Sequence, residues 1–72
     1  MRYTSNALDD RINWLNNKMP DNRKLSWRTC NGQVYITRKE TGMEVGQVDG
    51  FNSKKEACLA LEFAYGVLNL IQ

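Results

Sequence analysis

The spacing of apolar residues near the start of the chain is helical. A stripe recurs every three or four positions, at Leu8, Ile12, Leu15 and Met19. This spacing predicts a helix over residues 5–18, capped by Thr4 or Ser5 and stopped by Pro20, which cannot continue a helix. Trp14 lies beside the stripe, so we expect it at the helix edge or partly exposed.

From residue 25 the apolar period changes to two, which is typical of strands. Asn31-Gly32 separates two such runs and favours a two-residue hairpin turn, because both turn positions need positive φ. A two-residue loop fixes the register, which pairs Cys30 with Gln33, Thr29 with Val34, Arg28 with Tyr35, and Trp27 with Ile36. The pairing gives one apolar face (Trp27, Val34, Ile36) and one polar face (Ser26, Arg28, Tyr35, Thr37).

A second turn is predicted at Glu40-Thr41-Gly42, with Gly42 in the left-handed region. A third strand would then run from Met43 to Asp49. Val45 and Val48 cannot both face the core unless a bulge forms near Gly46. We favour Val48 as the inward residue.

The last helix carries the clearest start signal. Ser53 and Glu56 form a capping-box pattern, and the helix is predicted to run from there to the chain end. Its buried face is expected to centre on Ala57, Ala60, Ala64, Val67 and Ile71, with Leu61 and Leu68 beside it. The polar strip is only Lys55, Glu62 and Asn69, so more than half of the circumference is apolar.

The element order predicts one α+β domain spanning residues 1–72. Its order is αβββα: a three-stranded antiparallel meander with two helices packed on one face. The length of 72 residues leaves room for one small core only.

Composition argues against catalysis. The chain has no His, no Gly-rich phosphate loop and no nucleophile beside a base. Its one carboxylate pair, Asp9-Asp10, points apart on a helix. We therefore predict no enzyme, no cofactor and no metal site. The net charge is +2, but residues 18–39 are basic and residues 40–72 acidic, so the molecule is expected to be bipolar.

The cysteines favour a reducing compartment. Cys30 and Cys58 are far apart in the sequence and are expected to be free thiols in the cytoplasm, the alternative being a disulfide between them. The N-terminus lacks the apolar core of a signal peptide. The C-terminal apolar run is interrupted by Glu62 and Asn69, so no membrane span is expected.

Two groups of residues are candidates for partner binding. Arg28 and Tyr35 would form a cross-strand pair on the polar sheet face, with Arg38 and Lys39 near its end. Such a face can stack a nucleic-acid base or bind a partner. The alternative is an ordinary solvated sheet face with one cation–π pair. Trp14 is either packed at the helix edge or an anchor for a partner.

Helix, three strands, helix is also the order of the double-stranded RNA-binding domain. Asn52-Ser53-Lys54-Lys55-Glu56-Ala57 resembles the start of that family's second helix, where lysines reach phosphates. Cys58 stands where the family carries another Lys, and the hairpin turn lacks the family's His-containing loop. Lys54 and Lys55 are otherwise solvated residues near a cap.

A second resemblance covers more of the chain. Tyr3-Thr4-Ser5-Asn6, the strand opening at Trp27, and Glu56-Ala57-Cys58-Leu59-Ala60-Leu61 resemble small phage proteins with the ABA-sandwich domain. Asn6 stands where that family more often has an acidic residue. The resemblance implies this fold and a phage or prophage origin, and no catalytic site.

These observations predict a non-enzymatic phage-type protein in the cytoplasm of the bacterial host. It would mask a surface of a host or phage macromolecule, for example a host factor or a defence protein, through Trp14, Arg28, Tyr35, Arg38 and Lys39. The alternative is weak binding of double-stranded RNA through Lys54 and Lys55. A homodimer is also predicted, because Leu59, Phe63 and Leu70 extend the apolar surface of the last helix beyond one core-facing stripe. The alternative is a monomer whose first helix covers these residues.

Overall fold

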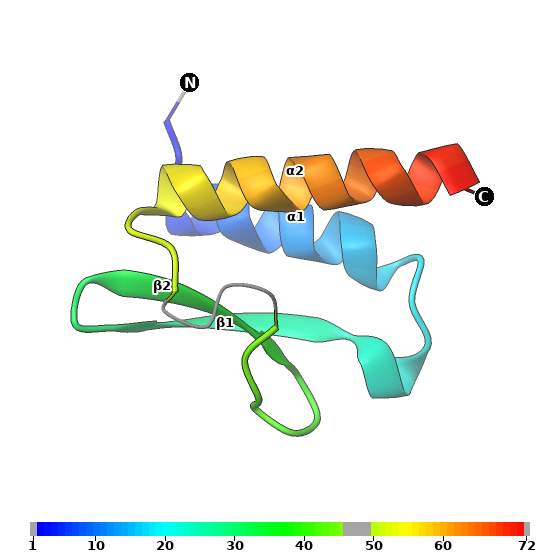
Figure 1. Cartoon of the computed structure of the whole chain (residues 1–72), viewed down its shortest axis with the longest axis horizontal. Helices are drawn as coiled ribbons and strands as arrows, with labels where there is room; N and C mark the ends of the chain where they lie inside the picture. Colours follow the sequence, from blue (N-terminus) through cyan, green and yellow to red (C-terminus); the bar gives the residue numbers. More distant parts are fainter. Residues whose placement is uncertain (1, 46–49, 72) are drawn as a thin grey trace.

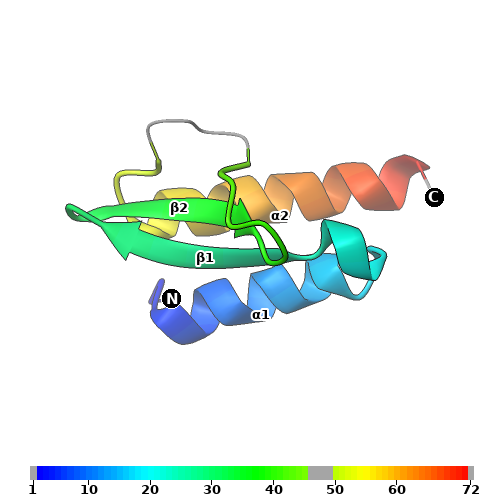
Figure 2. The same cartoon turned by 90° about the horizontal axis from the view of Figure 1, so that it is seen from below.

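A computed structural model describes residues 2–45 and 50–71 of the chain. Two helices lie on one face of an antiparallel hairpin, which makes a two-layer α+β arrangement (Figure 1). The elements are α1 (Ser5–Asn16), a short 3-10 helix η1 (Asp21–Arg23), β1 (Leu25–Cys30), β2 (Gln33–Arg38) and α2 (Lys54–Ile71). Seen from below, the hairpin runs along both helices (Figure 2). The predicted α+β class is therefore confirmed, and the described residues form a two-stranded antiparallel sheet.

Local chemistry explains where α1 begins and ends. The Thr4 hydroxyl accepts a hydrogen bond from the backbone N–H of Ala7, at 3.3 Å. The helix ends two residues earlier than predicted, and the Lys24 ammonium donates to the carbonyls of Asn16 (3.0 Å) and Met19 (2.9 Å) just beyond it. A cation at this end complements the helix dipole. The predicted stripe is buried: Leu8, Ile12 and Leu15 are at most 5% exposed.

The hairpin has the predicted register. Trp27 pairs with Ile36, Arg28 with Tyr35, and so on to the turn, where both Asn31 and Gly32 have positive φ. The Asn16 side chain bonds to Leu25 on both sides, donating to its carbonyl and accepting from its N–H, and thereby ties the end of α1 to β1. Thr37, expected on the polar face, is buried.

The third strand from Met43 to Asp49 is not seen in the described residues. The chain turns at Gly42, whose φ is +76° as predicted, and then meets β2 at two isolated bridges, Thr37 with Glu44 and Val34 with Phe51. Three positions separate the bridged residues on β2 but seven separate Glu44 from Phe51. A continuous ladder requires equal spacing, so four surplus residues interrupt the pairing.

Only one of the two valines considered as inward residues of this segment lies within the described residues. Val48 and Gly46 lie outside the described residues, so the preference for Val48 and the bulge at Gly46 fall there. Val45 packs against the core, and its backbone N–H donates to the carbonyl of Ile36 at 2.8 Å.

The buried face of α2 is rotated relative to the prediction. The Ser53 hydroxyl caps the helix by accepting from the N–H of Glu56, at 3.2 Å. Ala57 and Cys58 are fully buried and Leu61 nearly so, whereas Val67 and Ile71, expected at the centre of the face, are 38% and 74% exposed. The face turns toward α1, which is the main packing partner of α2.

Candidate functional site

The residues predicted to bind a partner do not form one patch. Arg28 and Tyr35 lie on the sheet face away from the helices, and they already bind each other. The Arg28 guanidinium lies 4.8 Å from the centre of the Tyr35 ring and forms a 2.6 Å ion pair with Glu44. The Tyr35 hydroxyl donates to Gln33, and Gly50 approaches the ring. This pair therefore matches the interpretation as a solvated sheet face with one cation–π contact.

Arg38 and Lys39 lie near the end of β2 and also have internal roles. The Arg38 side chain donates to the carbonyl of Arg23, at 2.6 Å, and closes η1 against the sheet. The backbone N–H of Lys39 donates to the carbonyl of Lys24, while its side chain lines a shallow pocket with Trp27 and residues of α1. In that region Trp27 Nε1 donates to Asp9, at 2.7 Å, so Asp9 serves the fold.

Trp14 lies at the seam between the two helices. Its ring is 5.5 Å from the ring of Tyr65 on α2, and the guanidinium of Arg11 lies 5.3 Å from its centre. With 42% of its surface exposed, it is a half-covered residue at the helix edge, on a different side of the molecule from Arg28 and Tyr35.

The seam also contains a buried ion pair that the sequence pattern did not predict. Arg11 is 5% exposed, and its Nε donates to the Glu62 carboxylate at 2.8 Å. This hydrogen bond raises the pKa of Arg11 above its usual value, against the opposing effect of burial. The charge of Glu62, expected on the polar strip of α2, is thus used to satisfy a cation inside the α1–α2 interface.

Cys58 lies next to this pair and is fully buried. Burial raises the pKa of its thiol, and the nearby Arg11 charge opposes that rise only in part. A buried thiol with a raised pKa is unreactive. Cys30 is an exposed free thiol at the hairpin turn, so the predicted free state of both cysteines agrees with the structure.

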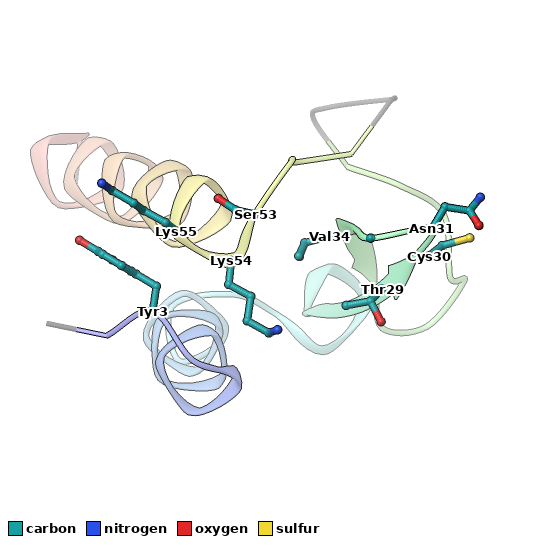
Figure 3. A pocket seen from close by; sticks show the side chains of 9 residues that line it. Tyr3, Thr29, Cys30, Asn31, Val34, Ser53, Lys54 and Lys55 are labelled. Carbon is teal, nitrogen blue, oxygen red and sulfur yellow. The ribbon is translucent and has the colours of Figure 1, made fainter.

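A hollow of about 660 Å³ lies where α2 begins. It is lined by Tyr3, by the hairpin turn (Thr29, Cys30, Asn31, Gly32, Val34) and by Ser53, Lys54 and Lys55. Figure 3 shows the two lysine side chains diverging from the start of the helix, so they do not converge on one point. The fold thus brings the lysines near the Asn31-Gly32 turn without forming a closed anion site.

The largest departure from an ordinary surface is on α2. Phe63, Leu70 and Ile71 are 75%, 85% and 74% exposed, and Leu59 and Val67 are exposed as well. We name Leu59, Phe63, Gly66 and Leu70, which line up along the outer side of the helix, the α2 ridge. In Figure 1 the hairpin and α1 lie below α2, and no described element lies above it. The first helix does not cover the residues singled out in the sequence for a dimer, Leu59, Phe63 and Leu70.

An apolar groove adjoins the ridge. It has a volume of about 470 Å³ and lies between α2, the edge of β2 and the segment after it. Phe63 and Val67 form its α2 wall, and Val45 and Phe51 lie opposite. Contiguous exposed apolar surface of this kind usually marks an interaction site.

Gly66 lies in the middle of the ridge, where no contact within the chain requires a glycine. A Cβ atom at this position would meet nothing within 4 Å. Gly inside a helix destabilises it by about 0.5–1 kcal/mol relative to Ala. Packing within one chain therefore does not require this glycine, and sequence reasoning had overlooked it.

No protein-family model matches the chain, and no curated protein and no solved structure matches it either. In residues 2–45 and 50–71, no helix combines the length and apolar character needed to cross a membrane. The same part of the chain holds no group of three metal-ligating side chains.

Proposed function

We propose that this chain is a non-enzymatic protein of phage type, which acts in the bacterial cytoplasm by masking a surface of a host or phage protein. The observation that carries the proposal is the exposed apolar surface of α2, together with the adjoining groove. The resemblance to phage ABA-sandwich proteins supports the origin, and the absence of His, the usual general base, supports a binding role.

The docking surface we assign differs from the residues first selected in the sequence. Arg28, Tyr35 and Arg38 are engaged with partners in their own chain, whereas the α2 ridge has none on its outer side among the described elements. Burying a large apolar side chain contributes about 1.5–3 kcal/mol. Phe63, Leu70 and Ile71 together would contribute about 5–9 kcal/mol before the cost of association, which is about 4–15 kcal/mol. The groove and polar contacts around it must add to the ridge for tight binding.

The test is capture of host proteins on the immobilised chain, with matched variants of the two surfaces. Phe63→Glu places a charge on the α2 ridge, and Lys39→Glu places one near the end of β2. We expect a specific host protein, identified by mass spectrometry, to be retained by the wild type and by Lys39→Glu and lost with Phe63→Glu. Retention by Phe63→Glu with loss in Lys39→Glu would move the site to the sheet end.

A second function is favoured by one observation, the hollow that Lys54 and Lys55 line together with the hairpin turn. It is weak binding of double-stranded RNA through phosphate contacts at the start of α2. Such binding would fall steeply between low and physiological salt, because counterions return to the RNA.

A gel-shift titration with a short RNA duplex separates this alternative from protein masking. Lys54→Glu should weaken RNA binding and reduce its salt dependence, whereas Phe63→Glu should leave both unchanged. Absence of a shift at low salt would remove the RNA alternative.

A further inference from the structure

The α2 ridge has the spacing of a coiled-coil seam. Leu59, Phe63, Gly66 and Leu70 follow one another at intervals of four, three and four residues. This is the a/d pattern with which one helix packs its side chains into the holes of another. A ridge that served only as a general apolar surface would need no such period.

The relative direction of two paired α2 helices decides which side chains of the ridge face each other. In an antiparallel pair with a two-fold axis midway between Phe63 and Gly66, Phe63 of each copy lies opposite Gly66 of the other. Leu59 lies opposite Leu70 in the flanking layers. The large ring therefore enters the space left by the missing side chain, and every layer holds matched volumes. A parallel pair would place Phe63 against Phe63 and Gly66 against Gly66, which overpacks one layer and leaves the other empty.

The charges of α2 permit this self-association. After Glu56 the only charged residue of the helix is Glu62, and its carboxylate is bound to Arg11 of the same chain. No like charges thus meet at the two-fold axis. The antiparallel helices also oppose their dipoles favourably.

From these observations we propose that a second copy of this chain docks on the α2 ridge, as an antiparallel, two-fold symmetric dimer with Gly66 as the socket for Phe63. The inference rests on the proposed function's assignment of α2 as the docking surface. It adds that the free protein covers this surface with itself, so that dimer and masked target compete. One helix face is smaller than the roughly 800 Å² per partner of a standard interface, so the dissociation constant should be micromolar.

Sedimentation equilibrium from about 1 to 300 µM tests the dimer. The variants exchange the large and the absent side chain between positions 63 and 66. The wild type should pass from 8.3 kDa to twice that mass. Phe63→Ala empties the layer and Gly66→Phe overfills it, so each should weaken the dimer about tenfold or more. The double variant restores one large and one absent side chain in each layer and should recover the wild-type constant within about threefold.

Cross-linking tests the direction of the helices. In a Cys30→Ser background, a mixture of Leu59→Cys and Leu70→Cys chains should form a disulfide-linked pair, whereas Leu59→Cys alone should not, because its two sites are about 16 Å apart along the axis. Efficient cross-linking of Leu59→Cys alone would overturn the antiparallel arrangement.

A wild type that stays at 8.3 kDa throughout, or a double variant no better than the single ones, would overturn the dimer. These variants lie on exposed positions, and far-UV circular dichroism confirms that each is folded. If the dimer is absent but Phe63→Glu still abolishes capture of a host protein, the inference fails and the proposed function stands. If the dimer forms as described and capture ignores Phe63→Glu, the inference is supported and the proposed function fails.

Discussion

The ion pair between the buried Arg11 and the half-buried Glu62 provides a quantitative test of the α1–α2 interface. The Arg11 side chain is 6% exposed and that of Glu62 is 38% exposed, and their atoms lie 2.8 Å apart. Glu62→Gln keeps the shape and one acceptor oxygen but removes the charge that balances Arg11. Breaking a fully buried pair costs about 3–5 kcal/mol, while fully exposed pairs contribute about 0.2–1 kcal/mol.

The intermediate burial of the pair places Glu62→Gln between these limits, at about 2 kcal/mol. Water reaches the carboxylate, and Arg11 keeps its bond to the carbonyl of Ala7 and its contacts with the rings of Tyr3 and Trp14. The expected loss is a large fraction of the roughly 4–10 kcal/mol that stabilises a domain of this size. The melting temperature should fall by about 8–16 °C.

Urea unfolding followed by circular dichroism measures the effect, with Glu40→Gln as the control because Glu40 is exposed. Arg11→Met removes the buried charge together with its need for a partner, so it should cost less than Glu62→Gln, and Glu62→Gln should add little in its presence. A Glu62→Gln protein within about 0.5 kcal/mol of the wild type would refute the argument that the pair holds the two helices together.

Three further predictions follow from single positions. Because burial raises the pKa of Cys58 above its ordinary value of 9.0, the Cys58 thiol loses its proton at a lower pH in the unfolded chain than in the folded one. The free energy of unfolding measured in urea should therefore decline above about pH 9, and it should decline less in Cys58→Ala. At neutral pH a thiol reagent should label Cys30 at once and Cys58 only on unfolding. Gly50→Ala should lower the free energy of unfolding by about 1–3 kcal/mol, because φ is +80° there and the added Cβ would lie 3.0 Å from the Tyr35 ring; an unchanged urea midpoint would contradict this. Ser53→Ala should cost about 1 kcal/mol by removing the cap of α2, whereas Ser53→Asp should retain most of it, as thermal melts can show.

Features that depend on residues close together in the chain could be predicted from the sequence. The hairpin register follows from the two-residue Asn31-Gly32 turn, since a turn of fixed length sets every pair behind it. The helix starts follow from Thr4 and Ser53, whose hydroxyls satisfy backbone N–H groups within the next three residues. The buried stripe of α1 follows from helical spacing alone because that helix has one apolar face.

The buried side of α2 could not be predicted in this way, because it depends on contacts between distant segments. More than half of its circumference is apolar, so burial of several different faces would be similarly favourable. Contacts with α1 select among them, because the Arg11–Glu62 pair and the Trp14–Tyr65 contact fix the rotation of the helix. The predicted third strand is not seen in the described residues, and a related argument applies to it. Whether the residues after Gly42 pair continuously with β2 depends on where Phe51 pairs with that strand. That docking is a contact between distant segments, which the alternation of residues within one segment does not encode.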